Sequence, residues 1–359
     1  MTKIALDVMG GDYAPDEMIQ GALDAVDKNG GVSVTLLGDA QTVGAKLAGL
    51  KPGWENGGRL SLVDAPEVIL TEEPPVAAIR SKKRSSIVMG MQMVKSGEAD
   101  AFVSAGSSGA VLVGALSIVG RLKGVERPPL APLIPTDRGV TLLVDCGANV
   151  DARASHLVQF AQMGSIYMEN VVGVKNPRVA IVNVGAEEEK GNALVKETFP
   201  LLKACPGINF IGSIEAREIP HGGADVVVCE AFAGNIILKL YEGVGSTILS
   251  TLKSALTRDL RTKIGALLIK PALKDAMKVF DASQYGGAPL LGLNGLVVKS
   301  HGNSKRREIC NSILQCVTFC EQGVNEKFKA GLLGGDGAGD SGLTQGQGAA
   351  GQTPAADSR

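Results

Sequence analysis

The chain has 359 residues, of which 45% are hydrophobic, 20% charged and 4% aromatic, and its formal net charge is -1. A typical domain has about 100–150 residues, so either one large core or two linked lobes is possible. The even charge balance argues against a general nucleic-acid-binding protein, which is usually far more basic. Because 47 residues are Gly and few are aromatic, we expect many tight strand–helix turns rather than an aromatic β-sandwich.

The start of the chain, MTKIALDVMGG, shows no apolar core or cleavage site of a secretion signal, and we expect a cytoplasmic protein. The longest uncharged run, residues 101–120, is interrupted by Ser and Gly. Its solid apolar part is too short for a membrane-spanning helix of about 20 residues, so we interpret it as a buried strand, a turn and a core helix. The six Cys form no CxxC pair, which favours reduced core thiols over a metal site.

Short Val- and Ile-rich runs alternate with helical patterns along the chain. Several runs are apolar nearly throughout, as strands covered on both faces of a sheet must be. This alternation predicts βαβ units, an α/β fold and a mostly parallel sheet. The predicted strands are Lys3–Val8, Val32–Leu37, Ala101–Ser104, Thr141–Asp145, Arg178–Val184, Ile208–Ile211 and Asp225–Cys229.

An apolar stripe with a spacing of four residues predicts a helical segment from about Glu242 to Phe280. Its polar face has seven basic and two acidic residues, a net charge of +5, and Pro271 is expected to break or kink it. Such a segment can lie on an anionic membrane. A helical hairpin at a dimer interface with a solvated basic face is the alternative, and the residues alone favour it.

The whole chain is predicted to divide into two parts. Residues 1–330 are predicted to form one catalytic α/β domain, with the helical segment at about 242–280 as an insertion. Residues 331–359 contain nine Gly and almost no apolar side chains after Leu333, which is typical of a disordered tail.

Small polar residues follow the first predicted strand and the strand at 101–104. In open α/β sheets, ligands bind beyond the carboxyl ends of the strands. Paired Gly let backbone N–H groups approach an anion, and Ser at a helix N-terminus offers further donors to phosphate. A plain tight turn and a simple Ser cap are the alternatives. The candidates are Gly10, Gly11, Asp12, Ser104, Gly106, Ser107, Ser108 and Gly109.

Later strand ends add acids, amides and a lysine. A carboxylate and an amide at one strand end suit proton transfer or oxyanion contact, although a capped turn would look alike. The candidates are Asp145, Gly147, Asn149, Asn183, Glu188, Lys190, Glu230 and Asn235. A separate basic run fits an acidic partner, phosphate or a solvated surface, and it contains Arg80, Lys82, Lys83 and Arg84.

Several common site motifs are missing from the sequence. No G-x-G-x-x-G follows the first strand, and neither a Walker A loop nor G-x-S-x-G occurs. The three His are outside any H-E-x-x-H. The absence of these motifs argues against a dinucleotide-binding site of the common type, a P-loop, a serine hydrolase and a His-rich zinc site. We therefore expect neither a cofactor nor a metal.

Seven stretches occur in a distinctive order between about residues 3 and 328. They are LDVMGGDYAP, SSIVMGMQMVKSGEADAFVSAGSSGA, RPPLAPLIPT, VDCGANVDARASHLVQFAQMGSIYME, NVGAEEEKGN, FAGNIILK and KPALKDAMKVFDASQYGGAPLLGLNG. This set resembles the bacterial fatty acyl-acyl carrier protein:phosphate acyltransferases. The chain departs from that family at Ser107 and Ser108, where S-A-G-N-T-G-A is common, and at Glu230, Ala231 and Ala233, where D-G-F-V-G-N is common.

The resemblance implies a three-layer α/β/α sandwich, similar to phosphotransacetylases and isopropylmalate dehydrogenases. It implies transfer of a fatty acyl group from acyl carrier protein to inorganic phosphate for phospholipid synthesis. It also implies a homodimer at the membrane surface, with the downstream membrane glycerol-3-phosphate acyltransferase as a further partner. For the helical segment it favours a membrane-binding tip at Leu256, Leu260, Ile264 and Leu267.

Phosphate can attack a thioester directly, so this reaction requires no nucleophile from the enzyme. The resemblance then suggests roles for the loops after the strands. The run from Ser104 to Gly109 would hold phosphate, and Asn149, Asn183 or Asn235 would donate to the oxyanion. Lys190 or a backbone amide would stabilise the leaving thiolate, and Glu188 and Glu230 are possible proton acceptors. The basic run at 80–84 would bind the acidic carrier protein.

Three other functions stay open on the sequence alone. A coenzyme A-dependent phosphotransacetylase is the nearest enzyme. A non-catalytic sensor of acyl carrier protein, or a scaffold for lipid enzymes, gains from the changed positions Ser107 and Glu230. An α/β dehydrogenase rests on fold analogy, which is a weak guide to function.

Overall fold

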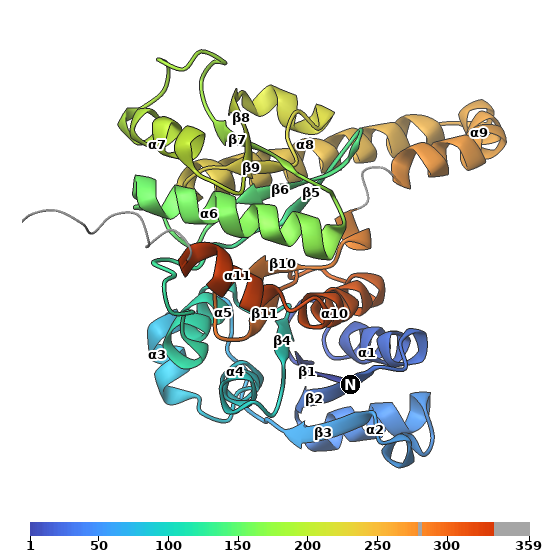
Figure 1. Cartoon of the computed structure of the whole chain (residues 1–359). Helices are drawn as coiled ribbons and strands as arrows, with labels where there is room; N and C mark the ends of the chain where they lie inside the picture. Colours follow the sequence, from blue (N-terminus) through green and yellow to red (C-terminus); the bar gives the residue numbers. More distant parts are fainter. Residues whose placement is uncertain (279–281, 334–359) are drawn as a thin grey trace, which may run out of the picture.

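The computed structural model describes residues 1–278 and 282–333, and within them the chain forms two mostly parallel sheets with helices on their faces (Figure 1). Only β10 is antiparallel in the first sheet, where it pairs with β11 at one edge. In spatial order the first sheet is β10 (Ala288–Leu290), β11 (Leu296–Lys299), β4 (Ala101–Ser104), β1 (Thr2–Asp7), β2 (Val32–Gly38) and β3 (Leu60–Asp64).

The second sheet has one antiparallel edge strand, β5, which pairs with β6. The two sheets meet through an isolated bridge between Leu130 and Leu290. In spatial order the second sheet is β5 (Leu133–Thr136), β6 (Gly139–Val144), β9 (Val226–Val228), β7 (Arg178–Val182) and β8 (Asn209–Ile214).

All seven predicted strands are present, as β1, β2, β4, β6, β7, β8 and β9, and the α/β class is confirmed. The division into two sheets was not predicted, and neither were β3, β5, β10 and β11. Two of these strands contain Pro, at Pro135 and Pro289, which is tolerated at sheet edges but weakens the strand pattern. The expected strand, turn and helix over 101–120 are confirmed as β4, α5 (Ser108–Gly114) and a π-helical turn, Ala115–Val119.

Helices cover both faces of the first sheet. Alternate residues of β1 face opposite sides, so Ile4 and Leu6 pack toward α1 (Asp16–Lys28) and α10 (Arg306–Glu321), whereas Ala5 packs on the other side. On that other side lie α3 (Pro75–Ser81), α4 (Ser86–Ser96) and α5. α2 (Ala40–Leu50) packs on β3.

The second sheet carries α6 (Ala154–Tyr167) and α7 (Ala193–Ala204), and α11 (Val324–Leu333) packs on α6. One hydrophobic core runs through both sheets, since Ile4 and Leu6 of the first belong to the same cluster as Leu142 and Val226 of the second. Further short turns of helix are Trp54–Gly57, Met168–Val172, Ala216–His221 and Ala282–Gln284.

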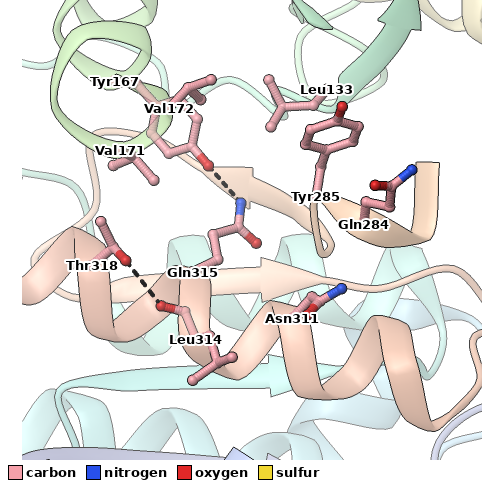
Figure 2. Close-up of a pocket in the computed structure, with 10 residues that line it drawn as sticks. All are labelled: Leu133, Tyr167, Val171, Val172, Gln284, Tyr285, Asn311, Leu314, Gln315 and Thr318. Atoms are coloured by element: carbon pink, nitrogen blue, oxygen red, sulfur yellow. Dashed lines mark hydrogen bonds between the residues drawn. The ribbon is translucent and has the colours of Figure 1, made fainter. Parts of the chain in front are cut away.

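A pocket of about 270 Å³ lies where α6, α10 and β5 converge between the two sheets (Figure 2). Gln315 of α10 donates through Nε2 to the Tyr167 hydroxyl, and both side chains are buried. The amide oxygen of the same side chain, Oε1 of Gln315, is buried and has no hydrogen-bond partner among the described residues. The pocket therefore lies between the two sheets, on the side of the first sheet that α10 covers.

A pair of long helices projects from the second lobe (Figure 1). α8 (Ala231–Thr257) begins eleven residues before the predicted start at Glu242, directly after the turn that follows β9. α9 (Leu260–Lys278) continues through Pro271, so the expected break is wrong. Leu267, whose carbonyl would receive the missing bond from Pro271, is on the exposed surface, where water can replace that bond. The predicted end at Phe280 lies outside the described residues.

Three smaller expectations concern thiols, membrane spans and the tail. Cys310 and Cys316 are buried in the core, as expected, and Cys320 is half-buried. No described helix is long and apolar enough to cross a membrane. α11 extends to Leu333, past the expected start of the tail at 331, and residues 334–359 lie outside the described part.

Candidate active site

The loops that follow β1 and β4 are joined by a buried carboxylate and a buried hydroxyl. Ser104 donates through Oγ to Asp7 Oδ2 over 2.7 Å, and it accepts the Gly106 amide at 3.0 Å. The other oxygen of Asp7 accepts the backbone N–H groups of Met9 and Gly10, each at 3.0 Å. The predicted phosphate loops therefore lie side by side and are fixed to each other.

Two glycines allow this close approach. A Cβ on Gly10 would lie 2.4 Å from Asp7 Oδ2 and 2.6 Å from the Gly106 nitrogen. Gly11 has a φ of +102° and would place a Cβ 3.0 Å from the carbonyl oxygen of Gly302, which itself accepts the amide of Asp12. Only residues without a side chain fit at both positions, so the backbone of three loops converges here.

The two serines before α5 differ in exposure. Ser107 is buried and caps the helix, since its Oγ accepts the Ala110 amide at 3.4 Å. Ser108 is exposed, and its hydroxyl has no hydrogen-bond partner among the described residues. The simple cap thus accounts for Ser107, whereas Ser108 and the backbone from Gly106 to Gly109 are the groups turned toward solvent.

Asp145, at the end of β6, organises its loop from a fully buried position. Its carboxylate accepts the backbone amides of Leu130, Ala148 and Asn149. Burial raises its pKa, and these hydrogen bonds work in the opposite direction. Gly147, with a φ of +127°, is in the same turn. The loop is held rigidly next to the start of α8.

The amide groups of Asn149 and Asn183 are already committed to the protein. Asn149 donates through Nδ2 to Asp145 and to the Pro128 carbonyl, and Asn183 donates to the Lys190 carbonyl and to Ser213. A primary amide has two N–H bonds, so neither side chain has a donor left for an oxyanion. Both act as loop anchors in this conformation.

The start of α8 brings together the remaining predicted residues of that loop. Glu230 is the N-cap, and its carboxylate accepts the amides of Phe232 and Ala233. This is the capped turn that the sequence left open as an alternative. A Cβ on Gly234 would lie 1.9 Å from the Asp145 carbonyl oxygen, so α8 contacts the Asp145 loop directly. Asn235 is exposed in the first turn, with no partner among the described residues.

Glu188 and Lys190 lie apart from this group. Lys190 pairs with Glu187 at 2.7 Å, which raises the lysine pKa, and Glu188 pairs with Lys203 at 3.2 Å. All of these side chains are exposed on the loop after β7. In the second sheet, β6 and β9 lie between β7 and the edge strand β5, so the loop after β7 is three strand steps, roughly 14 Å at about 4.8 Å per step, from that edge.

The basic run at 80–84 is partly tied to neighbouring chain. Lys82 donates to the Val68 carbonyl and to Glu73, and Arg84 pairs with Asp64 at 2.7 Å. Lys83, two residues after the end of α3, is exposed and donates only to the Ile79 carbonyl of that helix. Arg80 is exposed and has no partner among the described residues. Arg80 and Lys83 are therefore the members of the run free to meet another molecule.

A cluster of charged residues that was not predicted connects α8 to the loop after β11. Glu242 of α8 is 2.8 Å from Lys239 and 3.7 Å from His301. The neighbouring Glu242 carboxylate raises the pKa of His301, and burial lowers the pKa of Lys299 to about 8. The signal was present in the sequence, because β11 ends in Lys-Ser-His-Gly in the same way that other strands end in polar loops.

In the part of the chain that the structure describes, no group of His, Cys, Asp or Glu is arranged to hold a metal. The loops after β1 and β4 offer backbone N–H donors and small hydroxyls, and Lys299 ends the neighbouring strand β11. The exposed carboxamide of Asn235 belongs to α8. Such groups bind an anion and stabilise an oxyanion.

Comparison with known proteins shows the family of this chain. The profile described as "Fatty acid synthesis protein" matches residues 2–327. The chain belongs to this family. Relatives named phosphate acyltransferase include one from Clostridium novyi, 46% identical over 328 residues, and one from Alkaliphilus oremlandii, 47% identical over 336 residues. The first match covers 91% of this chain and 98% of the relative, and the second covers 93% and 99%.

Two solved structures have a fold similar to that of this member of the fatty acid synthesis protein family. A phosphotransacetylase from Streptococcus pyogenes has a TM-score of 0.59 at 18% identity, with 89% of this chain and 94% of that chain covered. A branched-chain phosphotransacylase from Enterococcus faecalis has a TM-score of 0.52 at 14% identity, with coverages of 89% and 98%. The predicted likeness to phosphotransacetylase folds is confirmed.

Proposed function

We propose that this protein is a phosphate acyltransferase, which moves a fatty acyl group from the thioester of acyl carrier protein to inorganic phosphate. The observation that carries the proposal is the identity of 46–47% to relatives of that name along nearly their whole length. The anion-binding character of the convergent loops supports it. The product is an acyl phosphate for glycerophospholipid synthesis.

The reaction needs one bond formed and one bond broken. A phosphate oxygen attacks the thioester carbonyl carbon, the C–O bond forms, and the C–S bond breaks with its electron pair left on sulfur. The thiolate then takes up a proton. The loops joined by Asp7 and Ser104 hold the phosphate through backbone N–H groups and the Ser108 hydroxyl. Asn235 donates to the oxygen of the tetrahedral intermediate, because its amide is the uncommitted one of the three candidates.

The test is release of free thiol from palmitoyl-acyl carrier protein by the purified enzyme, with hydroxylamine present as a trap. Thiol release that requires phosphate and yields a hydroxamate is the expected result. Phosphate-dependent turnover of palmitoyl-coenzyme A but not of the carrier-protein substrate would replace the proposal with a coenzyme A phosphotransacetylase. Binding of the carrier protein without turnover would favour the sensor or scaffold.

The acidic carrier protein is proposed to dock on the basic run, through its free members. Replacing both Arg80 and Lys83 by Glu should raise the KM for acyl carrier protein about tenfold at low salt, because charge steers association and salt screens it. The KM for phosphate should stay within a factor of two. Steady-state kinetics at two ionic strengths measures both.

Lys95→Glu is the matched control, since this lysine is exposed at the end of α4 and outside the run. Lys82 is unsuitable because its contacts with Val68 and Glu73 are structural. Equal effects of the control and the double variant would remove the run from the docking surface.

The tip of the helix pair is proposed to bind the membrane surface. Leu260, Ile264 and Leu267 are 74%, 54% and 69% exposed, and lysines accompany them. Between α8 and α9 near the tip is an apolar groove of about 490 Å³, lined by Leu249, Leu252, Leu256, Leu267 and Leu273 among others. Exposed apolar side chains beside cations are what an anionic bilayer surface binds.

Replacing Leu260 and Leu267 together by Glu should lower partitioning onto vesicles containing anionic lipid at least ~100-fold, since each buried Leu contributes about 1.5–3 kcal/mol. Vesicle sedimentation measures this, and thiol release in solution should be unchanged. Leu50→Glu, at an exposed Leu of α2, is the control. Partitioning of the double variant equal to that of the control would contradict the proposal.

A homodimer and a downstream partner complete the proposal. The exposed stripe of α8, formed by Phe232, Ile236, Leu240, Val244 and Ile248, is the surface that a second copy would cover. Sedimentation equilibrium measures the state, and a monomer at micromolar concentration would contradict it. The mixed anhydride is reactive, so the membrane glycerol-3-phosphate acyltransferase is the proposed consumer of the product.

A further inference from the structure

Three neighbouring strands of the first sheet end in a row of polar side chains. β1 lies next to β4, which lies next to β11, and they end at Asp7, Ser104 and Lys299. Leu6 is in register with Val103, and Ser104 with Lys299. Residues in register project from the same face of a sheet, so all three project toward the side covered by α4 and α5. The bond between Ser104 and Asp7 agrees with this.

The ammonium group of Lys299 is held at this edge with donors to spare. The Lys299 side chain is half-buried, and its Nζ donates to the carbonyl of Ser300. It forms no ion pair with any carboxylate in the described ranges, 1–278 and 282–333. An ammonium has three N–H bonds, so two of them have no protein acceptor. A half-buried ammonium that is near carboxylates but in an ion pair with none of them has N–H donors available for an anion.

Four charged groups influence the pKa of Lys299. Asp7 of β1, Asp12 of the following loop and Glu308 of α10 favour its charged form, and Lys239 of α8 opposes it. Burial outweighs the carboxylates and brings the pKa to about 8. Most of the ammonium is therefore protonated at neutral pH and loses its proton as the pH rises through about 8.

We propose that Lys299 is a catalytic residue that contacts the attacking phosphate and neutralises its charge next to Asp7 and Ser104. The inference rests on the proposed function, and it names the cation that the reaction needs. Without a cation, a phosphate dianion would have to approach a loop edge that carries Asp7 and Asp12. Lys190, the lysine singled out by the sequence, is paired with Glu187 and lies some strands away.

The test compares Lys299→Met with Lys299→Arg. The Met variant has nearly the same length without the charge, and it should lower kcat/KM for phosphate about 100-fold, which is the usual effect of removing one electrostatic contact. Its KM for acyl carrier protein should stay within threefold. The Arg variant should have a kcat/KM for phosphate at least tenfold higher than that of the Met variant. Lys329→Met, at an exposed lysine of α11, is the control and should be unchanged.

A pH profile gives a readout that a structural role would not move. For the wild-type enzyme, kcat/KM for phosphate should fall above about pH 8 and approach a tenfold loss per pH unit, because the ammonium is the active form. The Arg variant should lose this fall, since guanidinium stays charged throughout. A Met variant within threefold of wild type, or an alkaline fall that persists in the Arg variant, would overturn the assignment.

Phosphate binding separates this inference from the proposed function. Titration of the enzyme with inorganic phosphate, followed by ³¹P NMR, should show weaker binding to the Met variant than to wild type or the Arg variant. Equal binding to all three would overturn the role of Lys299 even if the enzyme is active. Wild-type protein that binds phosphate through Lys299 but releases no thiol would overturn the proposed function and leave the phosphate contact standing.

Discussion

Gly10→Ala should lower kcat at least 100-fold while the protein stays folded. The new Cβ would lie 2.4 Å from Asp7 Oδ2 and 2.6 Å from the Gly106 nitrogen, so the loops after β1 and β4 must move apart. A displacement of about 1 Å in positioning groups is enough for a 100-fold loss. Steady-state thiol release measures kcat, and the Tm shows whether the protein stays folded.

Gly49→Ala is the matched control, because this helical glycine has no atom within 4 Å of an added Cβ. It should leave kcat unchanged and stabilise α2 by about 0.5–1 kcal/mol. Full activity of Gly10→Ala would show that the close contact of the two loops is not needed for the reaction. A Tm drop of more than about 10 °C would place the effect in folding instead.

Asn235→Ala should lower kcat by about 10²–10³, the usual cost of losing one oxyanion donor. Its carboxamide is exposed in the first turn of α8, and it keeps both N–H bonds free, unlike Asn149 and Asn183. The α8 N-terminus adds the favourable end of the helix dipole at the same place. Single-turnover measurements with saturating phosphate isolate this step.

Asn235→Asp sharpens the result, because it has the same shape and suits a helix N-terminus but offers no N–H donor at neutral pH. It should lose as much activity as the Ala variant and keep the Tm of the wild-type protein. Ser250→Ala, farther along α8, is the control. A loss of less than fivefold in the Asp variant would exclude Asn235 as the oxyanion donor.

The strands that could be predicted are those whose pattern is local. β4 is buried throughout and β1 everywhere except at Lys3, so each contains an unbroken apolar run that can be recognised without knowledge of its neighbours. β10 has three residues with Pro289 in the middle, and its strand form depends on pairing with β11. The division into two sheets likewise depends on which strands pair, which is a tertiary property.

The candidate site was predictable in its loops and less so in its roles. The rule that ligands bind beyond strand ends correctly brought the loops of Gly10 and Ser104 together. It could not show that Glu230 is a helix cap or that Asn183 is already bonded, because a free and a committed side chain have the same sequence. Lys299 was missed because β11 was not among the predicted strands, so the polar residues at its end were not considered as a strand-end loop.

The most direct measurement uses phosphate labelled with ¹⁸O at all four oxygens, together with palmitoyl-acyl carrier protein and the wild-type enzyme. Direct attack by a phosphate oxygen predicts palmitoyl phosphate that carries all four labels, detected by mass spectrometry, in amounts equal to the thiol released. Palmitate released in place of an acyl phosphate, with the labelled phosphate left unconsumed, would contradict acyl transfer to phosphate and identify the protein as a thioester hydrolase.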